Sequence, residues 1–135
     1  MAALENPPSP IGERPRVLAV DDDAAFGALV AQLVEAAPGL ECVGLVSSGE
    51  AAVARAGELE PDLVLMDVTM PGIGGIGAAR QIKALRRSTV VVLISTTHPD
   101  DLPQEASECL ADEVVWKADL RPALLEEIWR RHRPG

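Results

Sequence analysis

Residues able to do acid, metal or phosphate chemistry stand directly after short apolar segments of the sequence. One segment ends at Asp21 and Asp22, another at Asp67, and later ones at Ser95 and Lys117. Carboxylates about 4 Å apart repel by about 4 kcal/mol at an effective dielectric constant of about 20, so three of them together require a compensating cation. Lys117 can supply one positive charge, and Mg²⁺ suits the remainder because it binds one or two carboxylates and retains waters. A carboxylate beside both cations can act as a nucleophile toward phosphorus.

The segments between these residues indicate how they could be brought together. Five short apolar runs predict buried strands, and the stretches between the runs have apolar residues at the three- and four-residue spacing of helices. Such alternation in a short chain predicts a parallel sheet with helices on both faces and right-handed crossovers. Ligands bind beyond the carboxyl ends of the strands in such a sheet, so the polar residues should gather at one edge. The runs are 17–20, 42–46, 63–66, 90–94 and 114–116.

Cap and stop residues locate the helices. Asp23 is placed to begin the first helix and Pro38–Gly39 to end it, while Ser47–Ser48 opens the second. The fourth helix is predicted to begin near Pro103 and the fifth near Pro122, since proline suits a first helical turn. The residues expected to face the core are Phe26, Leu29, Val30, Leu33 and Val34 in the first helix, Ile76, Ala79, Ile82 and Leu85 in the third, and Leu125 and Ile128 in the fifth.

The length and composition are those of one globular domain. The chain has 135 residues, of which 47% are hydrophobic and 24% charged, and chains usually divide into domains only well above this length. Residues 1–15 are proline-rich and polar, so we expect a flexible lead there. The domain is predicted to span residues 16–130, with a short tail at 131–135.

Charge and cysteine content narrow the classes of partner. Lys and Arg total 12 against 21 Asp and Glu, and the formal charge of −9 opposes direct contact with nucleic acid. Cys42 and Cys109 lie far apart without a CxxC motif, so buried, reduced thiols are expected rather than a disulfide framework or a zinc site. The sequence has no signal-peptide pattern and no apolar run of membrane-spanning length, so we expect a cytoplasmic protein without membrane contact.

Four motifs in order resemble the receiver domain of bacterial two-component response regulators. They are Val20–Asp23, Asp62–Gly72, Leu93–Thr96 and Val115–Lys117, and the resemblance covers about Arg16 to Trp129. It implies a flavodoxin-like (βα)5 fold, a doubly wound parallel sheet of five strands in the order 2-1-3-4-5. The chain is identified as a stand-alone receiver of this family.

The resemblance also implies a role for each site residue. Asp67 would accept a phosphoryl group from a histidine kinase or a histidine phosphotransfer protein, Ser95 would hydrogen-bond that group, and Lys117 would pair with it. Output would pass to a downstream protein by contact, with a homodimer as one form. The implied ligands of Mg²⁺ are Asp22 and Asp67 directly, Asp21 through water, and the backbone carbonyl of Thr69.

The sequence departs from the family pattern at several positions. Val114 stands where many receivers have the Tyr or Phe of the switch, and Thr96 replaces a smaller residue. Gly74–Gly75 leaves the start of the third helix without a side-chain cap. Thr69 and Thr97 carry no carboxylate or amide to position an attacking water, so slow hydrolysis of the phosphorylated state is expected.

Two alternatives remain open at this point. Thr96 and Val114 favour an interaction module that keeps the fold but works without phosphorylation. An Asp-nucleophile phosphatase of the haloacid dehalogenase type is the other, although that family needs a second Asp where this chain has Thr69. In the main hypothesis the fourth helix, fifth strand and fifth helix form the signalling surface, to which Trp129 contributes; in the simpler one, Trp116 and Trp129 only fill the core.

Overall fold

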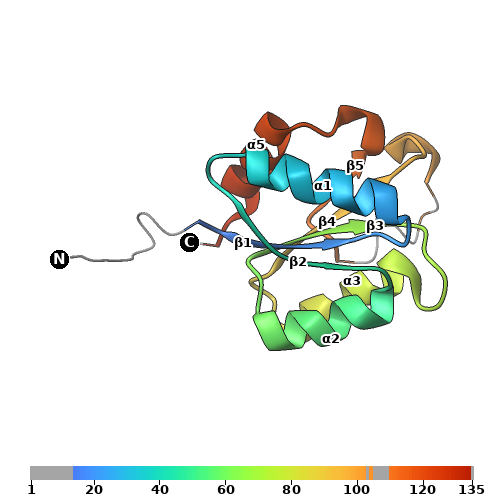
Figure 1. Cartoon of the computed structure of the whole chain (residues 1–135). Coiled ribbons are helices and arrows are strands. Elements are labelled where there is room, and N and C mark those ends of the chain that lie inside the picture. The colour runs from blue at the N-terminus through green and yellow to red at the C-terminus, as the bar shows by residue number, and fades with distance from the viewer. Residues whose placement is uncertain (1–13, 103, 105–109, 135) are drawn as a thin grey trace.

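A parallel sheet of five strands forms the centre of the protein in a computed structural model that describes residues 14–102, 104 and 110–134 (Figure 1). The strand order is β2-β1-β3-β4-β5, which confirms the predicted topology. Each strand begins or ends within one residue of its predicted apolar run. The strands are β1 (Arg16–Val20), β2 (Glu41–Val46), β3 (Leu63–Asp67), β4 (Val90–Ser95) and β5 (Glu113–Trp116).

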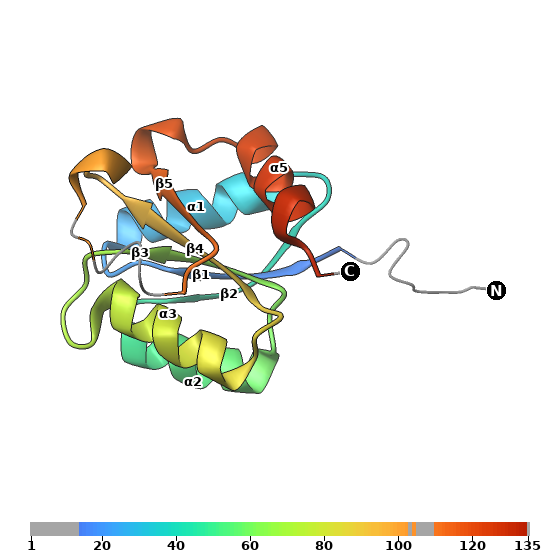
Figure 2. The ribbon, with the colours of Figure 1, turned by 180° about the vertical axis from the view of Figure 1, so that it is seen from behind.

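Helices cover both faces of this sheet, as Figures 1 and 2 show. One face carries α1 (Ala24–Ala36) and α5 (Pro122–His132). The other carries α2 (Gly49–Leu59) and α3 (Gly74–Leu85), which lie side by side. Two 3₁₀ turns, η1 (Pro99–Asp101) and η2 (Lys117–Asp119), complete the described elements. The expected helix near Pro103 and the residue Cys109 fall outside the described residues.

Strand alternation divides the core into two layers. In β1, Val17 and Ala19 face α1 and α5, while Leu18 and Val20 face α2 and α3. Both sets are almost completely buried, which explains why the strand sequences are apolar without interruption. The α2–α3 layer is built on small side chains, which let these helices approach the sheet closely: Ala52, Ala56, Ala78 and Ala79.

Capping follows the sequence closely. Asp23 accepts hydrogen bonds from the backbone N–H groups of Ala25 and Phe26 at 3.0 and 3.2 Å, and Ser48 accepts one from Ala51 at 3.0 Å. Helix α3 begins without a side-chain cap from its own N-cap residue, Ile73, as expected.

Three expectations about burial are wrong. Leu29 and Leu85 are 45% and 62% exposed. Leu29 precedes Val30, so it is turned about 100° away from the buried stripe, and Leu85 is the last residue of α3, where no further turn covers it. Cys42 is a free, partly exposed thiol because β2 is an edge strand of the sheet.

Helix α5 ends at His132 and packs its C-terminal end against the sheet. Its last residues contact the start of β5, where Glu113 accepts from Arg131 at 3.0 Å and lies 2.7 Å from His132 Nε2. Leu125 and Ile128 are fully buried, as predicted. Among the described residues, no helix has the length and apolar character required to span a membrane.

Candidate functional site

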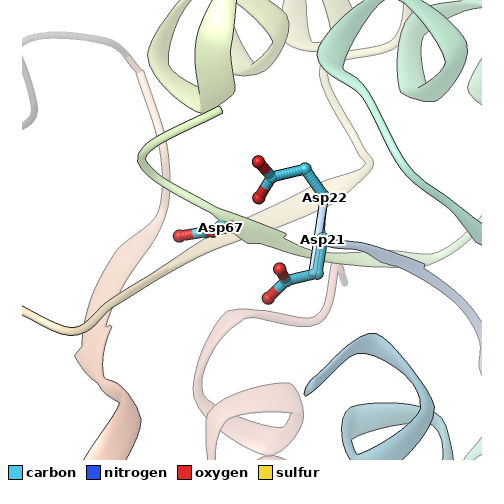
Figure 3. Close-up of side chains that lie close together, drawn as sticks. All are labelled: Asp21, Asp22 and Asp67. Carbon is cyan, nitrogen blue, oxygen red and sulfur yellow. The ribbon is translucent and has the colours of Figure 1, made fainter. Parts of the chain in front are cut away.

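Three aspartates meet at the carboxyl edge of the sheet. Asp21 follows β1 directly, and Asp67 is the last residue of β3, the neighbouring strand. Figure 3 shows these side chains with that of Asp22 around the ends of the two strands. One carboxylate oxygen from each residue lies within 4.8 Å of the others. Asp21 and Asp67 are 3% and 7% exposed, whereas Asp22 is exposed, so the cluster opens to solvent on one side.

Lys117 reaches this cluster from the end of β5. Its Nζ lies 3.3 Å from Asp21 Oδ2 and 3.8 Å from Asp67 Oδ2. The ammonium group also lies 4.0 Å from the centre of the Phe26 ring, in a cation–π arrangement that holds it from the side of α1. Phe26 was predicted only as a core residue. The signal that could have revealed this contact is its place one turn after the acidic triplet, where α1 faces the same edge.

Burial and charged neighbours together shift the pKa of Asp67. Burial, followed by the charge of Asp21, raises the pKa of Asp67 above its ordinary value. Lys117 and the backbone N–H of Thr69 act in the opposite direction without cancelling the effect, and Asp22 adds a further upward contribution. With three carboxylates beside one ammonium group, the described site residues carry more negative than positive charge when all are ionised.

The loop after Asp67 is fixed closely against its strand. The backbone N–H of Thr69 donates to Asp67 Oδ1 at 3.3 Å, and that of Val68 donates to Ile94 at 2.9 Å. Gly75 donates to the Val68 carbonyl at 3.0 Å. A Cβ on Gly75 would overlap the Asp67 carbonyl and lie 2.9 Å from Val68 Cα, so only glycine allows α3 to begin this close to the site.

Ser95 ends β4 beside the cluster. In the register of β3 and β4, Asp67 pairs with Ile94, which places Ser95 one residue further along. Ser95 is 3% exposed, and its Oγ accepts from the backbone N–H of Thr97 at 2.9 Å. The expected site residues therefore converge on one edge of the sheet, with Asp67 in the middle.

The two tryptophans lie in different environments. Trp116 is 36% exposed, and its Nε1 donates to the backbone carbonyl of Thr96 at 3.1 Å. Its ring also packs edge-on against His98, with the ring centres 5.4 Å apart. Trp129 is partly buried and packs against the core cluster on the α1–α5 face of the sheet. Only Trp129 thus fills core volume, and the link from Trp116 to Thr96 was not foreseen from the sequence.

Comparison with known proteins assigns the fold to a family. A family model described as "Response regulator receiver domain" matches residues 17–128. The chain is 40% identical over 88 residues to the response regulator GacA of Pseudomonas viridiflava, a match that covers 65% of this chain and 41% of that protein. It is 41% identical over 81 residues to a protein-glutamate methylesterase/protein-glutamine glutaminase of Nocardioides, covering 60% of this chain and 22% of that protein. The chain thus spans less than half the length of these curated relatives.

A solved structure gives the same answer. The response regulator domain of Thermotoga maritima CheB is similar with a TM-score of 0.76 and 30% sequence identity, over 89% of this chain and 96% of that one. The sheet order, the acidic edge and the family model agree. This chain belongs to the response regulator receiver domain family.

Proposed function

We propose that Asp67 is phosphorylated and that the phosphorylated protein signals by contact with another protein. The donor would be a phosphohistidine on a histidine kinase or a histidine phosphotransfer protein. A carboxylate oxygen of Asp67 attacks phosphorus, the P–N bond of the donor breaks, and the imidazole leaves with the electron pair. The observation that carries this proposal is the convergence of Asp21, Asp22 and Lys117 on Asp67.

The residues around Asp67 have complementary tasks. Lys117 would neutralise charge on the phosphoryl oxygens, and the hydroxyl of Ser95, at the end of the adjacent strand, would hydrogen-bond them. The hydrogen bond from Thr69 N–H to Asp67 Oδ1 orients the carboxylate, which leaves Oδ2 on the side of the Lys117 ammonium. Because Oδ1 already accepts from Thr69 N–H, these positions favour attack by Oδ2 of Asp67.

The donor set also fits a divalent metal ion. Three carboxylate oxygens within 4.8 Å of one another, with one ammonium nearby, match the preference of Mg²⁺ for hard oxygen ligands. Asp22, Asp67 and the carbonyl of Thr69 would hold the ion directly, and Asp21 through water. When bound, Mg²⁺ supplies charge neutralisation for phosphoryl transfer.

The proposed reaction also implies which partners the protein has and how long the phosphoryl group stays on it. We expect no turnover of an external substrate, because a receiver carries its own phosphoryl acceptor. We also expect a cytoplasmic protein whose partners are proteins rather than nucleic acid or membranes. Thr69 and Thr97 carry neither a carboxylate nor an amide to position an attacking water, which favours a long-lived phosphoryl adduct.

Phosphorylation is tested by incubating the protein with acetyl phosphate and Mg²⁺ and measuring its intact mass. We expect one phosphoryl adduct on the wild type and none on Asp67→Asn. Asp100→Asn, which changes an exposed aspartate near the same edge, is the matched control and should still be modified. An unmodified wild type would favour the interaction module that works without phosphorylation, and turnover of a phosphorylated substrate would favour the phosphatase.

A further inference from the structure

The N-termini of α2 and α3 touch each other directly beside the site. A Cβ on Gly49, the first residue of α2, would lie 2.7 Å from the carbonyl oxygen of Gly74 and 2.9 Å from Ile73 Cγ1. No real side chain tolerates such distances, so the two helix starts are in backbone contact. The loop that leads from Asp67 into α3 therefore rests on α2.

A hydrogen bond to Glu50 stabilises this contact between the starts of α2 and α3. Glu50 is the second residue of α2, and its Oε2 accepts a hydrogen bond from the backbone N–H of Ile73 at 3.2 Å. Ile73 is the N-cap residue of α3, which has no side-chain cap of its own. The carboxylate of Glu50 thus supplies from α2 the cap that α3 lacks, at a helix end where negative charge is favourable.

Gly72, which precedes Ile73, also lies close to the carboxylate of Glu50. Gly72 has a φ of +77°, and a Cβ there would lie 2.9 Å from Glu50 Oε1. Glycine is required both for the left-handed backbone and for the close approach of the carboxylate. The contact therefore involves two consecutive residues of the loop and both oxygens of Glu50.

We infer that Glu50 is a positioning residue for the site: it holds residues 72 and 73 so that the main chain of Thr69 stays in place beside Asp67. The loop is then fixed at both ends, by Gly75 against Val68 and by Glu50 against Ile73. The inference rests on the proposed function, because the carbonyl of Thr69 is a ligand of the proposed metal site. Glu50 is exposed and touches none of the three aspartates through a described contact, so it acts only through the loop.

The test compares Glu50→Ala, Glu50→Gln and Glu58→Ala. Glu58 is an exposed residue of the same helix, so its variant removes the same charge without touching the loop. Two quantities are measured for each protein: amide exchange of Ile73 by NMR, and the affinity for Mg²⁺ alone by calorimetry. Residues that orient metal ligands typically contribute about tenfold or more to affinity. We therefore expect Glu50→Ala to speed exchange at Ile73 and weaken Mg²⁺ binding about tenfold.

The variants separate positioning from charge. Glu50→Gln keeps an acceptor oxygen and should restore much of the protection at Ile73, while Glu58→Ala should match the wild type in both measurements. Unchanged exchange at Ile73 in Glu50→Ala, or an equal loss of affinity in Glu58→Ala, would overturn the inference. If the wild type binds Mg²⁺ and is phosphorylated while Glu50→Ala behaves identically, only the role of Glu50 is wrong. If the wild type binds no Mg²⁺, the metal site and the inference both fail.

Discussion

Aspartates lie at both ends of the strands of the parallel sheet: at the carboxyl edge, where the strands end, and at the amino edge, where they begin. Their hydrogen-bond partners differ between these two edges. At the amino edge, Asp62 accepts from the backbone N–H of Arg16 at 2.8 Å. Asp112 accepts from Val91 N–H at 2.8 Å and from Lys83 Nζ at 2.9 Å. Each carboxylate there has close donors of its own and joins two neighbouring strands.

At the carboxyl edge Asp21 and Asp67 each accept one backbone N–H, from Asp23 at 2.9 Å and from Thr69 at 3.3 Å, but they share a single ammonium group. Lys117 stands 3.3 and 3.8 Å from Asp21 and Asp67, and the pKa of Asp67 is raised by burial and by Asp21. Ionised Asp67 is therefore in a less favourable environment than in the unfolded chain, whereas Asp62 and Asp112 accept hydrogen bonds that join strands. This difference is consistent with the proposed binding of a cation and a phosphoryl group at the carboxyl edge.

Arginines reinforce the contrast. Arg14 donates to the carbonyl of Ala37 at 3.3 Å, and Arg16 to that of Leu59. Arg86 donates to the carbonyls of Glu60 and Pro61. All these carbonyls lie at or just after the C-terminal ends of α1 and α2, where positive charge is favourable. The arginines at the amino edge thus donate to carbonyls at helix C-termini, while the carboxyl edge remains acidic.

Removing an aspartate from the amino edge should have the largest effect on stability. Asp112→Ala leaves Val91 N–H without its acceptor and removes a carboxylate from Lys83, whose side chain is only 13% exposed. We expect the free energy of unfolding to fall by about 2 kcal/mol in urea titrations. Asp100→Ala, at a side chain that is 87% exposed, should stay within about 0.5 kcal/mol of the wild type. Equal stability of the two variants would contradict the contrast between the edges.

Magnesium should act only on the carboxyl edge. At ten times its dissociation constant, Mg²⁺ should raise the free energy of unfolding of the wild type by about 1.4 kcal/mol. Asp22→Ala should lose most of this gain because it removes a proposed ligand, whereas Asp112→Ala should keep it despite its lower baseline. The measurement is thermal or urea unfolding with and without Mg²⁺. A similar response in wild type and Asp22→Ala would exclude the proposed metal ligands.

Neutralising Asp67 without Mg²⁺ should stabilise the protein. Asp67→Asn relieves the repulsion with Asp21, and we expect a gain of about 1 kcal/mol at pH 7. Because the folded-state pKa of Asp67 is raised, the folded protein binds this proton more tightly than the unfolded chain. The contribution of Asp67 is thus most favourable below the unfolded-state pKa and is lost as pH rises through the folded-state pKa. Unfolding curves across the acidic range should show this component in the wild type and not in Asp67→Asn.

The smallest expected effect concerns Phe26 and Lys117. Phe26→Leu keeps an apolar side chain but removes the aromatic ring beneath the Lys117 ammonium group. A double-mutant cycle with Phe26→Leu and Lys117→Met should give a coupling free energy of about 0.5–1 kcal/mol in urea unfolding. The cycle of Leu33→Ala with Lys117→Met is the control and should give none. If the coupling free energy of both pairs were zero within experimental error, Phe26 would contribute only by filling space.

The sequence predicted the sheet edge better than the contacts made there. Continuous apolar runs ending in Asp21, Asp67 and Ser95 were sufficient to place these residues together, because parallel strands all end at one edge. Long-range contacts such as Glu50 to Ile73 leave no local pattern, since 23 residues separate the partners. Leu29 and Leu85 were misplaced for a related reason: helical spacing identifies an apolar stripe but not how much of it the neighbouring elements cover.

Gly75 has a consequence for anyone redesigning this chain. Since the backbone of Asp67 and Val68 occupies the space that its Cβ would need, position 75 admits no other amino acid without moving the acidic edge. Gly57, inside α2, is different: apart from its chain neighbours and the backbone of its own helix, no described atom lies within 4 Å of the place where a Cβ would stand, so alanine is accommodated there. Because alanine favours helix by about 1 kcal/mol over glycine, that exchange should stabilise the protein without disturbing its neighbours. Two glycines that look alike in the sequence thus mark one fixed and one adjustable position for protein engineering.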